Sequence, residues 1–96
     1  MSCVVYEWQG WALDALRGIE PYEVVQVLGA ERRWPRPAKA PSGVDVLTVW
    51  ARTRDGRPLI VAVRQVGSWD WTIIGARDMD PAEATEFARW EEATND

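Results

Sequence analysis

The chain has 96 residues, which suits one small domain spanning residues 1–96 with a modest core. It contains no histidine and a single cysteine, Cys3, which excludes an internal disulfide and removes the commonest metal ligand and neutral-pH base. We therefore expect neither a metal nor a cofactor. Since we find no secretory leader and no apolar run of membrane length, we also expect a cytoplasmic protein with no membrane partner.

The net charge of −4 is unevenly distributed along the chain. Residues 31–77 hold nine basic and four acidic side chains, whereas residues 78–96 hold one basic and seven acidic side chains. Two interpretations follow from this asymmetry. Either the acidic end neutralises the basic middle within the fold, or the basic middle binds a polyanion or an acidic partner.

The first 30 residues predict a short strand over residues 4–8, a short helix over 10–17 and a second helix over 21–28. A proline begins the second helix, at the position where a missing N–H is tolerated. Apolar residues of this helix recur at i, i+3 and i+4, and they are Val24, Val27 and Leu28.

Residues 31–43 predict a loop without regular structure, because they contain three prolines and four basic residues. We expect this loop to be exposed and more mobile than the sheet. Trp34 either anchors the loop to the body of the domain, which we favour, or stacks on a nucleic-acid base while the cations hold phosphate. The residues predicted to bind RNA or a partner are Arg32, Arg33, Trp34, Arg36, Arg52 and Arg54.

A strand meander follows, with strands predicted over residues 46–53, 58–66 and 69–76. The Asp55-Gly56 pair suits a two-residue type I′ turn, and this turn would place Trp50 opposite Val61. On the last strand, the period of two predicts that alternate residues share one face, namely Trp69, Trp71, Ile73, Gly75 and Arg77.

The final helix carries a strong start signal at Asp80-Pro81, with Glu83 completing a capping box. Its predicted outer face carries Glu86, Glu91 and Glu92. The complete order is β-α-α-β-β-β-α, which predicts an α+β domain with a small antiparallel sheet.

Catalysis in this chain would depend on arginine, lysine, tyrosine or carboxylate side chains. Arginines can bind a phosphate and stabilise the charge that develops during strand cleavage, while a carboxylate accepts the proton of the attacking group. Five arginines fall on or beside the predicted sheet, and they are Arg52, Arg54, Arg57, Arg64 and Arg77. Their spacing alone does not define a specific site.

Several short motifs also occur in an order that can be compared with a known family. They are Tyr6-Glu7-Trp8, Arg17-Gly18-Ile19-Glu20-Pro21-Tyr22, Gly56-Arg57-Pro58-Leu59-Ile60 and Ile74-Gly75-Ala76-Arg77-Asp78, followed by a helix with Glu83 and Phe87. In this order and spacing they resemble the BrnT family of toxins from bacterial toxin–antitoxin pairs. The resemblance covers nearly the whole chain and is weakest across residues 31–45.

The resemblance implies a fold similar to RelE-type ribonuclease toxins, RNA as substrate and a small DNA-binding antitoxin as partner. Arg77 matches the Ala-Arg position of the family, Arg57 its Gly-Arg position and Glu83 an acidic position of the last helix. With the basic middle segment lying on a sheet, the catalytic candidates are Arg77 and Arg64, which would bind phosphate, assisted by Arg57 or Arg52.

The chain also departs from the family pattern. Arg17 stands where the family often has histidine, and Asp78 and Asp80 follow Arg77 where the family tends to be basic. Together with the acidic end of the chain, these departures motivate an alternative, which is a non-catalytic protein-interaction module with the same fold. The sequence leaves the RNA target, the partner and the oligomeric state open.

Overall fold

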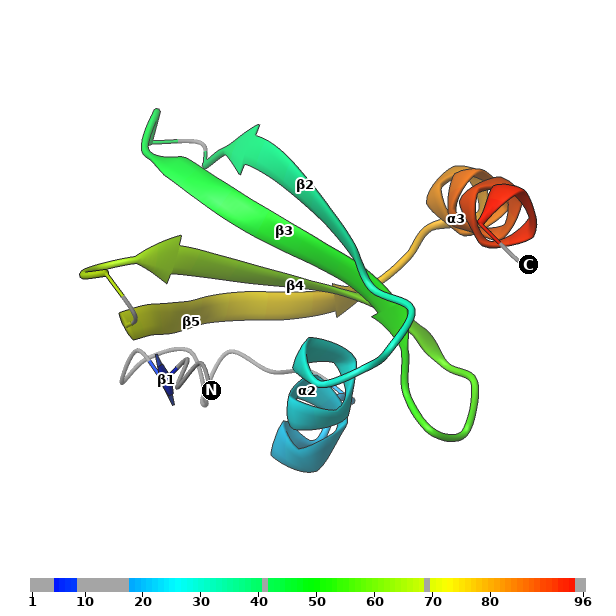
Figure 1. Ribbon diagram of the computed structural model, residues 1–96, viewed down its shortest axis with the longest axis horizontal. Helices are drawn as coiled ribbons and strands as arrows, with labels where there is room; N and C mark the ends of the chain where they lie inside the picture. The colour runs from blue at the N-terminus through cyan, green and yellow to red at the C-terminus, as the bar shows by residue number, and fades with distance from the viewer. Residues whose placement is uncertain (1–4, 9–17, 41, 69, 95–96) are drawn as a thin grey trace.

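The computed structural model describes residues 5–8, 18–40, 42–68 and 70–94, with side chains from residue 18 onward (Figure 1). Its elements are β1 (Val5–Trp8), α2 (Pro21–Leu28), β2 (Trp34–Lys39), β3 (Asp45–Arg52), β4 (Pro58–Gln65), β5 (Asp70–Asp78) and α3 (Pro81–Ala93). The helix predicted over residues 10–17 lies outside the described residues. The predicted α+β class is confirmed.

Five strands form one sheet in the order β1-β5-β4-β3-β2. β1 runs parallel to β5, and the other three pairings are antiparallel. The helices α2 and α3 pack against opposite faces of the sheet, near the end where β3 stops and β4 starts (Figure 1). We call these faces the α2 face and the α3 face.

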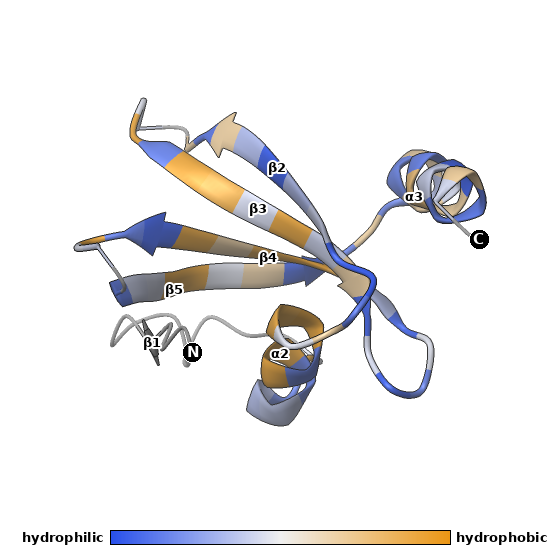
Figure 2. Cartoon of the chain, in the orientation of Figure 1, coloured by the Kyte–Doolittle hydropathy of each residue, from blue (hydrophilic) through white to orange (hydrophobic). Residues whose placement is uncertain are grey.

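The α2 face holds the larger part of the core. The predicted stripe of Val24, Val27 and Leu28 is buried there, as the sequence indicated. These side chains pack on apolar residues of the central strands, including Val61 and Ile73. Figure 2 shows hydrophobic stretches along β3 and β4 and on one part of α2. Burial of such side chains stabilises the fold by about 1.5–3 kcal/mol each.

The α3 face carries an aromatic cluster. Trp50, Ile60 and Phe87 are buried there. Trp34 lies 5.6 Å from Trp50 in an edge-to-face arrangement and 5.4 Å from the ring of Trp90, on which it stacks. The favoured interpretation of Trp34 as an anchor is therefore confirmed.

The prediction of an irregular loop over residues 31–43 is wrong, because residues 34–39 form the edge strand β2. The N–H of Ala40 donates to the carbonyl of Val44, which fixes the alternation of hydrogen-bonded pairs along the two strands. By this alternation, Pro35 and Pro37 occupy positions that point away from β3, so their missing N–H groups leave the ladder intact. Proline is tolerated on an edge strand for this reason.

The predicted hairpin register is also wrong by one residue, since Trp50 lies opposite Ile60 and not Val61. The loop has three residues instead of two. Thr53 donates its N–H to the carbonyl of Arg57, and Gly56, at φ 91°, is the residue with positive φ. A type I′ turn needs positive φ at both central residues, and Asp55 does not adopt it. The one-residue shift moves Trp50 to the α3 face.

The prediction that alternate residues of the last strand share one face fails at a bulge. Ile73 pairs with Val63, but Gly75 pairs with Ala62, so Ile74 is an extra residue in β5. Trp71 and Ile73 consequently belong to the α2 face, whereas Gly75 and Arg77 belong to the α3 face. Trp69 lies outside the described residues.

Candidate binding surface

Arg77 lies where β5 leads into α3. The predicted capping box is confirmed, because Asp80 accepts from the Glu83 N–H and Glu83 accepts from the Asp80 N–H. The Glu83 carboxylate also accepts two hydrogen bonds from the Arg77 guanidinium, at 2.5 and 2.6 Å. These bonds from Arg77 lower the pKa of Glu83 to about 2, against the opposing effect of burial, with a further contribution from the Asp80 N–H. Arg77 is therefore paired within its own chain.

We expect the pair of Arg77 and Glu83 to make the free energy of unfolding depend on pH in the acidic range. The pKa of Glu83 is lower in the folded chain than its ordinary value near 4.3, so its stabilising effect is complete above about pH 5 and is lost as the pH falls towards 2. Because the Arg77 side chain is 58% exposed, solvent screening limits the expected loss to about 1 kcal/mol. Urea unfolding at a series of pH values, followed by tryptophan fluorescence, measures it.

Glu83→Gln is the matched control, since glutamine retains the shape of the capping side chain without its charge. The difference in unfolding free energy between the parent and this variant should shrink as the pH falls below 5. A difference that stays constant down to pH 3 would contradict the proposed contribution of the pair.

Arg57 is held on the opposite side of the sheet by three neighbours. Its guanidinium donates to both carboxylate oxygens of Asp78, at 2.8 and 2.9 Å, to the Gly18 carbonyl at 2.8 Å and to Glu23 at 3.1 Å. The hydrogen bonds from Arg57 lower the pKa of Asp78. Arg57 thus connects the β3–β4 loop, the end of β5 and the start of α2.

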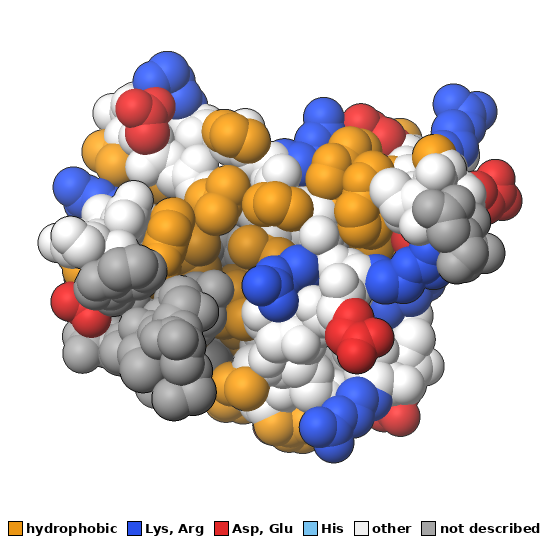
Figure 3. Space-filling view, viewed as in Figure 1, with side chains coloured by type: hydrophobic (Ala, Val, Ile, Leu, Met, Phe, Trp, Pro, Cys, Tyr) orange, Lys and Arg blue, Asp and Glu red, His pale blue; other side chains and the backbone are white. Residues whose placement is uncertain are grey.

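The acidic side chains of α3 face the sheet in part. Glu91 accepts three hydrogen bonds from Arg52, at 2.9 to 3.1 Å, and these bonds raise the pKa of Arg52. Glu86 pairs with Arg36 at 2.8 Å, and the Glu91 carbonyl accepts a hydrogen bond from Arg32. The prediction that Glu91 lies on the outer face of the helix is therefore wrong, whereas Glu86 is exposed, as predicted, although it pairs with Arg36. Figure 3 shows acidic and basic side chains adjacent near α3.

Some of the predicted binding residues gather around one cavity. A hollow of about 530 Å³ lies between the end of α2 and the β3–β4 loop, and Arg32, Arg52 and Arg54 line it together with Glu31 and Val25. Three further candidates lie outside it, and one of them, Trp34, belongs to the aromatic cluster on the α3 face. Arg33 donates to the Ala30 carbonyl at 3.1 Å, and Arg36 lies over the rings of Trp34 and Trp50.

The three catalytic candidates are not brought together. Arg77 belongs to the α3 face, and Arg57 reaches towards α2. Arg64 lies four residues along β4 from Ile60, the residue opposite Arg77, which corresponds to about 13 Å. The arrangement therefore offers separate cations instead of one phosphate-binding cluster.

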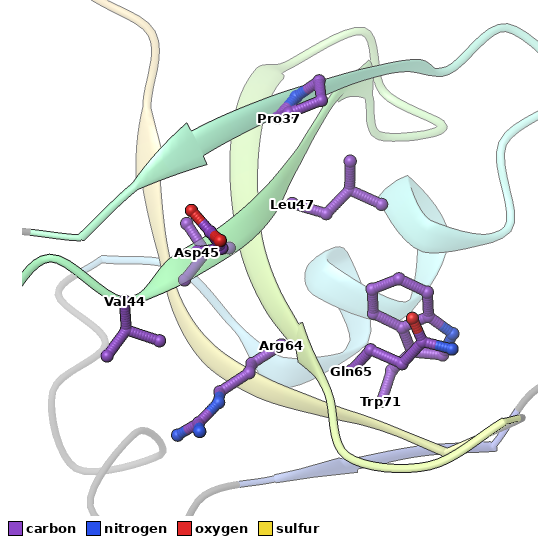
Figure 4. A pocket seen from close by; sticks show the side chains of 8 residues that line it. Pro37, Val44, Asp45, Leu47, Arg64, Gln65 and Trp71 are labelled. Atoms are coloured by element: carbon purple, nitrogen blue, oxygen red, sulfur yellow. The ribbon is translucent and has the colours of Figure 1, made fainter.

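Arg64 lies at the other end of the sheet, beside a cavity of about 480 Å³. Figure 4 shows Arg64 and Gln65 leaving β4 on opposite sides, with Leu47 and Trp71 on the Gln65 side. Among the side chains that the structure describes, none forms an ion pair with Arg64. This feature distinguishes it from Arg52, Arg57 and Arg77.

The ion pairs support the first interpretation of the charge asymmetry, in which the acidic end neutralises the basic middle. The excess of carboxylates after residue 77 was the sequence signal for these pairs. Within the described parts of the chain, no group of His, Cys, Asp or Glu side chains has the arrangement of a metal site, and neither helix has the length and hydrophobicity to cross a membrane.

Comparison of the sequence with protein-family models and with curated proteins finds no match.

Proposed function

We propose that the chain is the BrnT-like component of a bacterial toxin–antitoxin pair, and that it acts by binding a protein, a small DNA-binding antitoxin. The order of the motifs supports this proposal. Tyr6-Glu7-Trp8 falls on β1, Gly56-Arg57 in the β3–β4 loop and Ala76-Arg77 at the end of β5, directly before α3. We also propose that the fold is similar to that of RelE-type toxins.

One observation favours protein binding over cleavage of RNA. The guanidinium groups of Arg36, Arg52, Arg57 and Arg77 already have carboxylate partners in the same chain. A phosphate group would have to displace a glutamate or an aspartate to reach any of them. An RNA-cleaving site that used these four cations would therefore have to break ion pairs within the chain.

The side of α2 next to the arginine-lined cavity has the composition of a protein interface. Tyr22 and Val25 are 59% and 60% exposed, and they lie on neighbouring turns of the helix. Val25 also lines the cavity that contains Arg32 and Arg54. Aromatic side chains and arginines are enriched at protein interfaces. We call Tyr22, Val25, Arg32 and Arg54 the α2 surface.

A second candidate function is ribonuclease activity, as the resemblance implies. The observation that favours it is Arg64, which forms no ion pair with any described residue and borders an open cavity. In this case Arg64 would bind the phosphate, with Arg77 contributing after separation from Glu83.

The proposal predicts the outcome of a co-purification experiment. We expect the product of the adjacent reading frame to co-purify with this chain when both are expressed together. Reversing two charges of the α2 surface, with Arg32→Glu and Arg54→Glu, should weaken the complex by about tenfold or more, because charges at an interface set both encounter and specificity. Isothermal calorimetry measures the affinity.

Arg89→Glu is the control, since this exposed α3 residue lies outside the α2 surface. Equal weakening per reversed charge by this variant would mean that net charge alone determines binding. If the adjacent product does not bind, but expression of the chain slows growth and Arg64→Gln relieves the effect, the ribonuclease candidate replaces the protein-binding one.

A further inference from the structure

The helix α3 is attached to the sheet through a small part of its surface. Phe87 is its one buried residue among those described, while Ala84 and Trp90 are half-buried. Figure 1 shows the helix beyond the end of the sheet, joined to β5 by an extended segment. The docking of α3 therefore depends on a few side chains.

Those side chains combine aromatic rings with carboxylates on one side of the helix. The ring centroids of Phe87 and Trp90 lie 5.5 Å apart, and three of the four glutamates of the helix form ion pairs with arginines of the sheet. Each of the three glutamates has its own arginine. The pairs are Glu83 with Arg77, Glu86 with Arg36, and Glu91 with Arg52.

The surface beneath α3 is complementary to this pattern. The guanidinium of Arg36 lies 4.5 Å from the Trp34 ring and 4.8 Å from the Trp50 ring, and that of Arg52 lies 5.5 Å from Phe87. Aromatic rings and cations thus alternate across β2 and β3. We call Trp34, Arg36, Trp50, Arg52 and Arg77 the α3-binding surface.

The arginine of each ion pair is open to water, with side chains 37% to 58% exposed, which makes the pairs replaceable. The side chains of Arg36 and Glu86 are 37% and 49% exposed. Exposed pairs contribute little and weaken with salt, so the burial of Phe87 supplies most of the attraction. A helix that offers equivalent rings and carboxylates can therefore compete with α3, provided that it overcomes the high effective concentration of a tethered segment.

We propose that the α3-binding surface is a docking site for an acidic, aromatic amphipathic helix of a partner protein, which binds by displacing α3. The partner helix presents two aromatic side chains one turn apart, with carboxylates on the same side. This inference rests on the proposed function only in taking the partner to be a protein. A helix is favoured over single-stranded RNA, which also suits a basic aromatic surface, because a helix of this chemistry already occupies it.

The test uses the full chain and a labelled synthetic peptide with the sequence of residues 80–94, followed by fluorescence anisotropy. The parent should bind the peptide weakly, because its own α3 competes. Phe87→Ala in the full chain loosens α3, and we expect this variant to bind the peptide about tenfold or more tightly than the parent. Raising the salt concentration should reduce the gain.

A second variant keeps the test decisive if Phe87→Ala does not fold. Glu86→Gln with Glu91→Gln removes the carboxylates of two ion pairs and leaves the aromatic cluster intact, so a smaller gain in peptide affinity is expected. Adding Arg52→Gln should abolish the gain, whereas Arg89→Gln should leave it unchanged.

Equal peptide binding by the parent and both loosened variants would overturn the inference. Preferential binding of a short polyuridylate by the loosened variants would assign the surface to nucleic acid and would also overturn it. If the peptide does not bind but the adjacent gene product still co-purifies, this inference is rejected and the proposed function is retained. Loss of co-purification with peptide binding retained would reject that function alone.

Discussion

Replacing Trp50 by alanine should lower the free energy of unfolding by about 3–5 kcal/mol, the range typical of large aromatic residues removed from a core. Trp50 is 7% exposed, packs with Ile60 and Phe87, and donates its indole N–H to the Thr48 hydroxyl at 3.1 Å. Because these contacts hold α3, its amides should lose protection from hydrogen exchange before those of β4. Urea unfolding followed by far-ultraviolet circular dichroism gives the total loss.

Val61→Ala is the control for the position of Trp50. Val61 is fully buried on the α2 face, so this variant should destabilise the fold without a selective effect on α3. In the register expected from a two-residue turn, Trp50 would have faced Val61, and both variants would have loosened the same face. Selective exposure of α3 by Val61→Ala would contradict the observed register.

The β3–β4 hairpin shows which features local sequence signals can predict. The Asp55-Gly56 pair correctly predicted a tight turn, because glycine at positive φ is needed in either type of loop. Whether the loop has two or three residues depends on which strand faces gain buried partners. The tertiary packing of Trp50 and Ile60 against α3 determines the loop length, which the turn residues alone do not specify.

Signals confined to one element were more informative. The stripe of α2 and the capping box at Asp80 involve residues within four positions of each other, and both were predictable. The bulge at Ile74 was not predictable, because it adjusts β5 to its neighbour β4 and has no signature of its own in the sequence.

The candidate site follows the same division. The opposite charges of the middle and the end of the chain suggested, as one of two interpretations, that arginines and carboxylates would meet. They did not predict the partners, since Arg57 and Asp78 are 21 residues apart and Arg52 and Glu91 are 39 apart. Contacts over such separations depend on the strand order and on the face to which each residue turns.

The edge strand β2 carries two prolines, Pro35 and Pro37. Restoring N–H groups with Pro35→Thr and Pro37→Thr should make the protein self-associate in a concentration-dependent manner. The backbone nitrogens of both prolines point away from β3. An N–H at either position would therefore be free to pair with a strand of another chain. Threonine favours strands and adds little apolar surface, so any association reports the new backbone donors. Sedimentation velocity over a range of concentrations measures it.

Ala38→Thr is the matched control, because the backbone N–H of Ala38 already points to β3 and the substitution adds no outward donor. The double variant should also be less stable by about 1–2 kcal/mol, since loss of two prolines increases the entropy of the unfolded chain. Sedimentation indistinguishable from that of the parent would show that the prolines do not protect this edge. If they do, a partner cannot dock by extending the sheet at β2 and must use side-chain surfaces, such as those beside α2 and beneath α3.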